Sequence, residues 1–139
     1  MQLQFFGDLD VRYTRLEYVD FGAGGQYVGV LQGTFKGQRL SGDVFLINSP
    51  PKRPDNVNLP TISGVLTTAE GAKVFMQLNG ISLAREARRH FVTSVILRCG
   101  DDRYAWVNQV FGVMEGVLTP DDRAVAQVHL CEPTIKVPA

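Results

Sequence analysis

The chain has 139 residues, enough for one domain with its own core, and its 45% hydrophobic and 20% charged residues are typical of a soluble globular protein. Its fourteen basic and fourteen acidic side chains cancel, so no net charge attracts nucleic acid or anionic membranes. No apolar run approaches the roughly 20 residues that span a bilayer, and the start, Met1–Gln4, lacks the features of a signal peptide. We therefore expect a cytoplasmic protein with neither nucleic acid nor membrane as a partner.

Glycines separate short runs rich in Val, Ile, Phe, Tyr and Thr along the whole chain, which predicts an all-β fold. Eight strands are expected, at 11–20, 26–33, 38–48, 57–68, 72–81, 91–99, 104–117 and 124–132. Several glycine or proline turns join them, at 22–25, 36–38, 69–72 and 119–122. Serial hairpins of about eight strands predict a single domain, 1–139, in which an antiparallel meander closes into a calycin-like β-barrel.

Two segments interrupt the strand pattern. The proline-rich segment 49–56 is expected to be a loop, long enough to fold over a barrel mouth. Segment 82–90 is either one short helix with Ser82 as its N-cap or a mobile basic loop. Its basic side chains form either a solvated turn or a clamp for a carboxylate or phosphate at the barrel mouth. They are Arg85, Arg88, Arg89 and His90.

Two of the expected strands, 38–48 and 72–81, each have one purely apolar face and one mixed face. The mixed faces carry the polar residues Arg39, Asp43, Gln77 and Asn79. These faces point either into the lumen or to solvent, since an eight-stranded barrel can be filled with side chains or hold a ligand. The placement of the single tryptophan, in the strand expected at 104–117, favours the lumen.

Tyr104, Trp106 and Asn108 fall at alternate positions after a charged turn, and alternate residues of a strand share a face. They would present two large rings and three polar tips on one surface. A ligand pocket has such a wall, because a few placed polar groups orient a ligand against apolar surface. A tryptophan in the lumen would supply apolar contact area and an N–H donor to a ligand. We expect these three residues to line a ligand-binding lumen.

Four short motifs, in order, resemble those of a family of small bacterial barrels, domain of unknown function 3237, also called UPF0311. Segment 32–42 resembles "G-G-T-F-x-G-P-x-L-x-G", and 103–108 resembles "R-Y-A-W-L-N". Between them, 66–72 is similar to a "T-x-D-G-A" hairpin, and Asn79-Gly80 to the "N-x-G" that follows it. The resemblance extends from about residue 26 to 132 and implies a calycin-like barrel with a central cavity, but no established reaction.

This chain departs from the family pattern at two places. The family has a "G-A-D-W" element where this chain has the proline-rich loop, and an "A-R-Y" element where it reads Thr61-Ile62-Ser63-Gly64. An Asp, a Trp and an Arg that act on a ligand in relatives would thus be missing. Arg53 or Asp55, from the loop, could replace them in ligand binding.

Any catalysis is expected to be acid–base chemistry without a cofactor. Asp43 and Glu115 interrupt apolar strands, and a carboxylate inside an apolar barrel has a raised pKa suited to proton transfer near neutrality. Tyr104 and Asn108 could donate hydrogen bonds to a developing enolate or oxyanion. Equally, the two carboxylates could mark a bulge or a strand end, since each adjoins a glycine.

No metal site or cofactor motif is expected. His90 and His129 stand alone, and Cys99 and Cys131 lack metal-ligand spacing, which predicts two reduced thiols. Gly22–Gly25 lacks the Lys-Ser/Thr that completes a phosphate loop.

Three functions follow from these patterns. The first is a barrel that binds a small hydrophobic or aromatic oxygenated metabolite, with Arg39, Arg53, Gln77 and Asn79 contributing beside Tyr104, Trp106 and Asn108. The second is a cofactor-independent isomerase, cyclase or lyase that uses Asp43, Glu115 and Tyr104. The third is a structural homodimer or higher homo-oligomer with a filled barrel.

Overall fold

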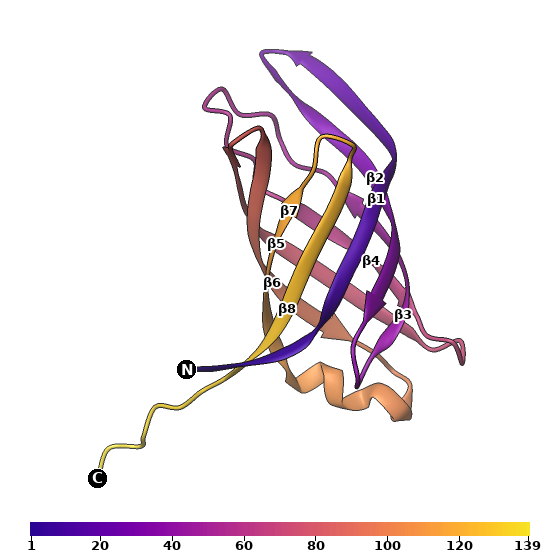
Figure 1. Ribbon diagram of the computed structural model, residues 1–139, viewed down its shortest axis with the longest axis vertical. Helices are drawn as coiled ribbons and strands as arrows, with labels where there is room; N and C mark the ends of the chain where they lie inside the picture. The colour runs from indigo at the N-terminus through magenta and orange to yellow at the C-terminus, as the bar shows by residue number, and fades with distance from the viewer.

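The runs of β-branched and aromatic residues form eight antiparallel strands in the computed structural model, which describes residues 1–139. The strands are β1 (Gln2–Gly22), β2 (Gly24–Lys36), β3 (Ser41–Asn48), β4 (Thr61–Thr67), β5 (Lys73–Arg85), β6 (Arg88–Arg98), β7 (Phe111–Leu118) and β8 (Arg123–Glu132). One 3-10 helix, η1 (Asp102–Gln109), precedes β7 (Figure 1). The predicted all-β barrel with at most one short helix is confirmed.

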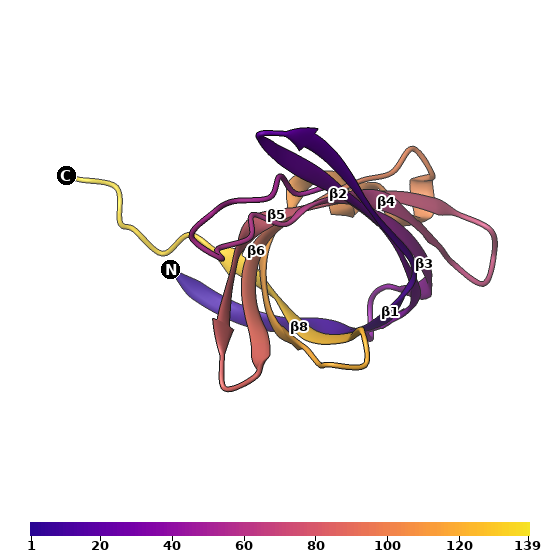
Figure 2. The ribbon, with the colours of Figure 1, turned by 90° about the horizontal axis from the view of Figure 1, so that it is seen from above.

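Each strand pairs with the next along the chain, and β8 pairs with β1, so the sheet closes on itself. The closing seam runs from the Gln2–Glu132 pair to the Arg12–Arg123 pair. Figure 2 looks down the barrel and shows the strands surrounding one interior. Within the barrel, closure pairs each strand on both sides and leaves no free sheet edge along the seam.

The purely apolar strand faces fill this interior. On β3, Leu46 is fully buried, and on β5 the same is true of Val74 and Leu78. The mixed faces of β3 and β5 point outward, where Phe45 and Phe75 stay nearly half exposed. The expectation that the mixed faces line the lumen is therefore wrong. An eight-stranded barrel has room inside for little more than its own side chains, and burying apolar ones gains the most free energy.

The two ends of the barrel differ (Figure 1). At the lower end, η1 lies across the opening, beside the β2–β3 and β4–β5 turns. At the upper end lie loop 49–60 and a two-stranded ribbon, in which β1 and β2 continue past the barrel to the turn at Gly22–Gly24. We call these the closed end and the open end.

Two expected elements are wrong. Residues 104–109 belong to η1 and not to a strand, because Asp101 caps the helix by accepting a hydrogen bond from the Arg103 backbone N–H. Segment 82–90 forms the ends of β5 and β6, with a two-residue turn in which Glu86 and Ala87 have φ of 51° and 62°. Both angles suit the hairpin turn that continues the twist of paired strands. The structure contains no helix long and apolar enough to span a membrane.

Candidate ligand-binding site

Tyr104, Trp106 and Asn108 lie at the closed end, where they build a plug rather than a lumen wall. The Trp106 ring stacks edge-to-face on Phe6, with the centroids 5.9 Å apart. The Arg39 guanidinium lies 4.0 Å from the Trp106 ring centroid on the solvent side. The exposed Asn108 carboxamide pairs with the backbone of Cys99, accepting from its N–H at 2.9 Å and donating to its carbonyl at 2.7 Å.

Tyr104 is tied to the hairpin between β4 and β5. Its hydroxyl donates to the Glu70 carboxylate at 3.0 Å. Loss of hydration and the hydrogen bond to this carboxylate raise the pKa of Tyr104. The polar tips that suggested ligand recognition are thus largely occupied by bonds that hold η1 in place.

The other residues expected in the lumen lie on the outer wall. Asp43 on β3 and Glu115 on β7 are exposed, as are Gln77 and Asn79 on β5. The expected carboxylate inside the barrel is therefore absent at these positions. Strand alternation explains this, since each of these residues adjoins a side chain that the interior holds.

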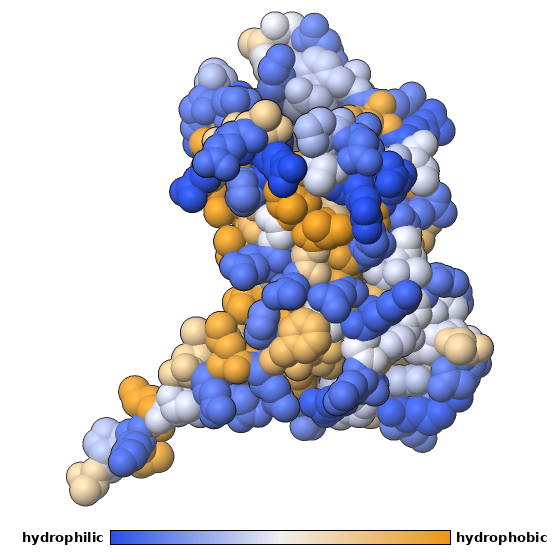
Figure 3. Space-filling view, viewed as in Figure 1, coloured by the Kyte–Doolittle hydropathy of each residue, from blue (hydrophilic) through white to orange (hydrophobic).

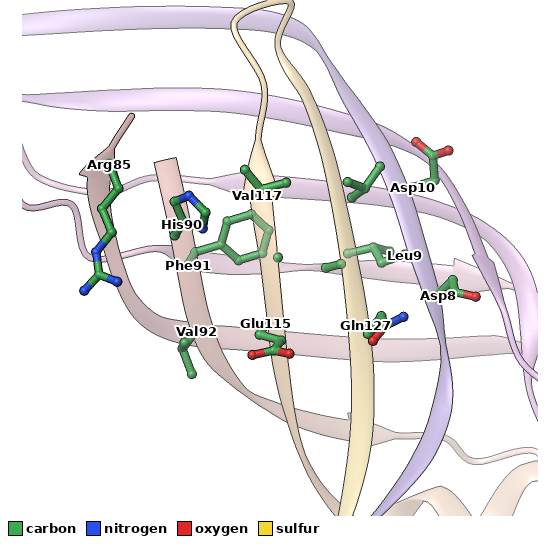
Figure 4. Close-up of a pocket in the computed structure, with 13 residues that line it drawn as sticks. Asp8, Leu9, Asp10, Arg85, His90, Phe91, Val92, Glu115, Val117 and Gln127 are labelled. Carbon is green, nitrogen blue, oxygen red and sulfur yellow. The ribbon is translucent and has the colours of Figure 1, made fainter. Parts of the chain in front are cut away.

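A hollow of about 770 Å³ is a shallow open depression on the outer wall. It extends over β6, β7, β8 and β1, between side chains such as Arg85, Val92 and Glu115 (Figure 4). The space-filling view shows apolar surface at the waist of this face, framed by hydrophilic side chains (Figure 3). Its openness leaves a ligand mostly in water, whereas a binding pocket buries most of its ligand.

A narrow, partly open cavity of about 70 Å³ lies inside the barrel, toward the open end. Apolar side chains form most of its wall: Leu9, Val11, Leu31, Leu46, Pro60, Ile62, Leu78, Phe91, Met114, Leu118 and Ala124, together with the ring of Tyr13. Its polar lining comes from Tyr13, Asn48, Asn58, Ser82 and Arg89. This volume is about that of two water molecules.

A second hollow of about 260 Å³ adjoins this cavity at the open end. The two share five lining residues, Tyr13, Asn48, Asn58, Arg89 and Leu118. Loop 49–60 borders the outer hollow through Lys52 and Arg53. The predicted position of this loop over a barrel mouth is thus confirmed, and Arg53, whose guanidinium is paired with Asp55, lies at the entrance. We call the cavity and the outer hollow together the mouth site.

Tyr13 and Asn48 form the polar core of the mouth site. The Asn48 amide group donates to the Tyr13 hydroxyl at 2.9 Å, and its carbonyl accepts from the Thr61 backbone N–H at 3.1 Å. The Tyr13 hydroxyl therefore accepts one bond while its own proton has no acceptor in the protein. Burial raises the pKa of Tyr13, despite the hydrogen bond from Asn48 that opposes this shift. This hydroxyl is a neutral donor available to a ligand.

Arg89 is the single charged side chain that lines both parts of the mouth site. Its guanidinium donates to the Asn56 carboxamide oxygen at 2.9 Å and to the Asn56 backbone carbonyl at 3.2 Å. No carboxylate forms an ion pair with it. A guanidinium held in place by neutral oxygens keeps its charge for an anionic or carbonyl oxygen of a ligand.

Two further side chains near the cavity have polar atoms without partners. The Asn58 carboxamide lines both hollows, while its backbone N–H and carbonyl pair with those of Ser82. The Thr93 hydroxyl is buried without a hydrogen-bond partner, on β6 beside the cavity residue Met114. An unpaired buried hydroxyl costs about 1–3 kcal/mol.

The structure groups no three His, Cys, Asp or Glu side chains in a way that could hold a metal ion. His129 faces outward against the Phe5 ring, with centroids 5.6 Å apart. Both cysteines are free thiols, and that of Cys99 donates to the Lys73 carbonyl inside the barrel.

Sequence reasoning missed Tyr13, Asn48 and Asn58, and considered Arg89 only as part of a basic patch. These residues come from four separate segments, and only the closed barrel brings them together. A usable signal existed in Asn48, a carboxamide that ends an alternating apolar series directly before a proline-rich loop.

Among the comparisons with known proteins, the one with solved structures finds matches, and those matches identify the fold. No protein-family model matches the chain, and no curated protein matches it. The resemblance to domain of unknown function 3237 therefore stays a prediction.

Several solved structures share the barrel. A conserved protein of unknown function from Rhodopseudomonas palustris is 20% identical, with a TM-score of 0.81 over 93% of this chain and 96% of that one. A beta-barrel like protein from Acinetobacter baumannii is 15% identical, with a TM-score of 0.80 over 93% and 94% of the two chains. An enzyme from Penicillium herquei is 16% identical, with a TM-score of 0.69 over 93% of each chain. At these identities the likeness establishes the fold alone.

Proposed function

We propose that this barrel binds a small hydrophobic or aromatic molecule that carries an anionic or carbonyl oxygen, and that it does so at the mouth site. One observation carries the proposal. The Tyr13 hydroxyl proton and the Asn58 carboxamide make no hydrogen bond within the protein, the Arg89 guanidinium is bonded to neutral oxygens alone, and all three residues border one mostly apolar hollow. Small-molecule sites combine apolar walls with a few convergent polar groups in this way.

The sizes of the two hollows suggest how a ligand would sit. A drug-sized ligand site usually measures about 300–1,000 Å³, and the narrow cavity alone is far smaller. The adjoining hollow supplies most of the volume. A ligand would therefore place its oxygen near Tyr13 and Arg89 and its apolar body under loop 49–60.

Binding is a better-supported function than turnover. Acid–base catalysis needs a group that takes up a proton as well as one that gives it. Tyr13 is a donor, but no carboxylate or histidine lines either part of the mouth site. The isomerase, cyclase or lyase alternative rested on Asp43 and Glu115, which lie on the outer wall.

Thermal unfolding against a panel of small carboxylates, phenols, lactones and fatty acids tests the proposal. A ligand at about a hundred times its dissociation constant adds roughly 2.7 kcal/mol of stability, a rise of about 10 °C for a domain of this size. The rise should shrink strongly in Arg89→Ala and persist in Arg88→Ala, which removes an exposed arginine one residue away. No stabilisation by any class in the panel, or equal stabilisation of both variants, would contradict the proposal.

A further inference from the structure

The outer wall of the barrel carries exposed apolar side chains on several strands, Phe5 on β1 and Phe111 on β7 among them. On β3 and β5 the outward side chains include Phe45 and Phe75, which are 46% and 43% exposed. Exposed apolar residues are ordinary by themselves, so what distinguishes the β3–β4–β5 wall is the way that strand register arranges its rings and its charges.

Strand register arranges the outward side chains of the β3–β4–β5 wall symmetrically about β4. Phe45 of β3 and Phe75 of β5 both pair with Val65 of β4. One pair further along the strands, Asp43 of β3 and Lys73 of β5 both pair with Thr67. An aromatic ring thus flanks Val65 on each side, while an acid and a base flank Thr67.

We propose that a second copy of this chain packs on the β3–β4–β5 wall, with the two-fold axis of the dimer running along β4. Such an axis brings β3 of one copy against β5 of the other, twice, as an isologous interface requires. Phe45 of each copy then meets Phe75 of the other, and Asp43 meets Lys73. Because the register places these residues symmetrically about β4, the wall of one copy is complementary to the same wall of the other copy.

The charges on the wall fit a second copy of the same chain. Asp43 and Lys73 are exposed, and neither forms an ion pair within the chain. Their side chains lie on opposite sides of β4, so the two-fold axis pairs unlike charges at both places. The chain as a whole has no net charge, so two copies do not repel each other at long range.

The exposed apolar area is large enough for the centre of a modest interface. Phe45, Phe75 and Ile47 are 41–46% exposed. At about 200 Å² for each side chain, they offer on the order of 250 Å² together. A standard interface buries about 800 Å² per partner, of which somewhat more than half is apolar. The neighbouring polar residues of the wall, Ser63 and Gln77 among them, would supply the rim.

Sedimentation equilibrium between about 5 and 200 μM tests the dimer. We expect the wild-type chain to approach twice its 15.3 kDa mass across this range. Phe75→Glu should shift the dissociation constant upward by at least tenfold. Phe21→Glu, the same change at an exposed ring on the β1–β2 ribbon, should leave the constant unchanged. A wild-type chain that stays monomeric, or equal effects of the two substitutions, would overturn the proposal and leave the wall to a different partner.

A charge exchange tests the direction of the axis. Asp43→Lys alone opposes two lysines at each contact, and Lys73→Asp alone opposes two aspartates, so each variant should dimerise more weakly than wild type. An equimolar mixture of the two variants should associate again, because each contact then pairs a lysine with an aspartate. Unchanged melting temperatures would show that both variants fold. A mixture that associates no better than its components would overturn the proposed axis.

Discussion

The closed end and the open end of this barrel use similar residue types for opposite purposes. At the closed end, Trp106 packs on Phe6 and beneath Arg39, and Asn108 pairs with the backbone of Cys99. At the open end, Tyr13 and Arg89 border a hollow, where the Tyr13 hydroxyl proton has no acceptor and the Arg89 guanidinium is bonded to neutral oxygens alone. An aromatic ring, a carboxamide and an arginine thus seal one end and border a hollow at the other.

The difference lies in whether the polar groups are satisfied. Buried polar groups with partners stabilise a fold, whereas unpaired ones cost free energy until something binds them. At the closed end the Tyr104 hydroxyl and the Asn108 carboxamide have protein partners, as expected of structure. At the open end the Tyr13 hydroxyl proton and the Asn58 carboxamide have none, as expected of a site. The predictions below separate these two roles, from the largest expected effect to the smallest.

Trp106→Ala should lower the free energy of unfolding by about 2–3 kcal/mol, because it removes the ring that covers the barrel core at the closed end. This loss lies at or below the low end of the range for replacing a large aromatic residue by alanine, because Trp106 is only partly buried. Urea denaturation followed by far-UV circular dichroism would measure it. Ligand affinity of the folded variant should stay within about twofold of wild type, and a variant that folds normally but loses affinity would move the binding site to η1.

Arg89→Ala should weaken ligand binding about tenfold or more, since a hydrogen bond to a charged group contributes about 1.5–3 kcal/mol. Isothermal titration calorimetry with the panel's best ligand would measure this loss. Arg88→Ala is the matched control. Equal losses in the two variants would mean that Arg89 acts only through the overall charge of the hairpin.

Tyr13→Phe should lower the free energy of unfolding by about 1 kcal/mol, because the Asn48 amide group then loses its acceptor inside the barrel. The same variant should lose several-fold in ligand affinity, because the donor to the ligand is gone. Urea denaturation and calorimetry on one preparation give both numbers. Undiminished affinity would remove Tyr13 from the site.

Alkaline pH should weaken the folded state through Tyr13. Burial raises the pKa of this phenol above its ordinary value of 10.0, so the folded chain holds the proton more tightly than the unfolded chain. The contribution of Tyr13 to the free energy of unfolding is fully present below pH 10. It is lost as the pH rises from 10 through the raised pKa of Tyr13. The wild type should therefore lose slightly more stability than Tyr13→Phe between about pH 9 and 11. Identical pH dependence of the two would contradict the shift.

Much of the fold followed from local patterns. The turns at 69–72 and 119–122, with glycine or proline at the required positions, separate strands where they were expected. Segment 82–90 was misjudged because Ala, Leu, Arg and Glu favour helix in isolation. Pairing of β5 with β6 overrides that preference, and Glu86 and Ala87 make the turn without a glycine.

The site was harder to predict for a physical reason. The alternation of Tyr104, Trp106 and Asn108 has the period of a strand, but the cap at Asp101 turns the chain into η1. The mouth site has no local signature at all. Tyr13, Asn48 and Arg89 lie on three strands, and their proximity depends on barrel closure and on which face of each strand points inward.

The most direct test of the central claim is to locate a bound ligand by amide chemical-shift changes in ¹⁵N-labelled protein, which its 15.3 kDa mass makes practical. We predict that the panel's best ligand shifts the amides of Tyr13, Asn48, Ser82 and Arg89 and leaves those of Val107 and Asn108 unchanged. Shifts concentrated on η1, with the open end unaffected, would contradict the assignment of the two ends.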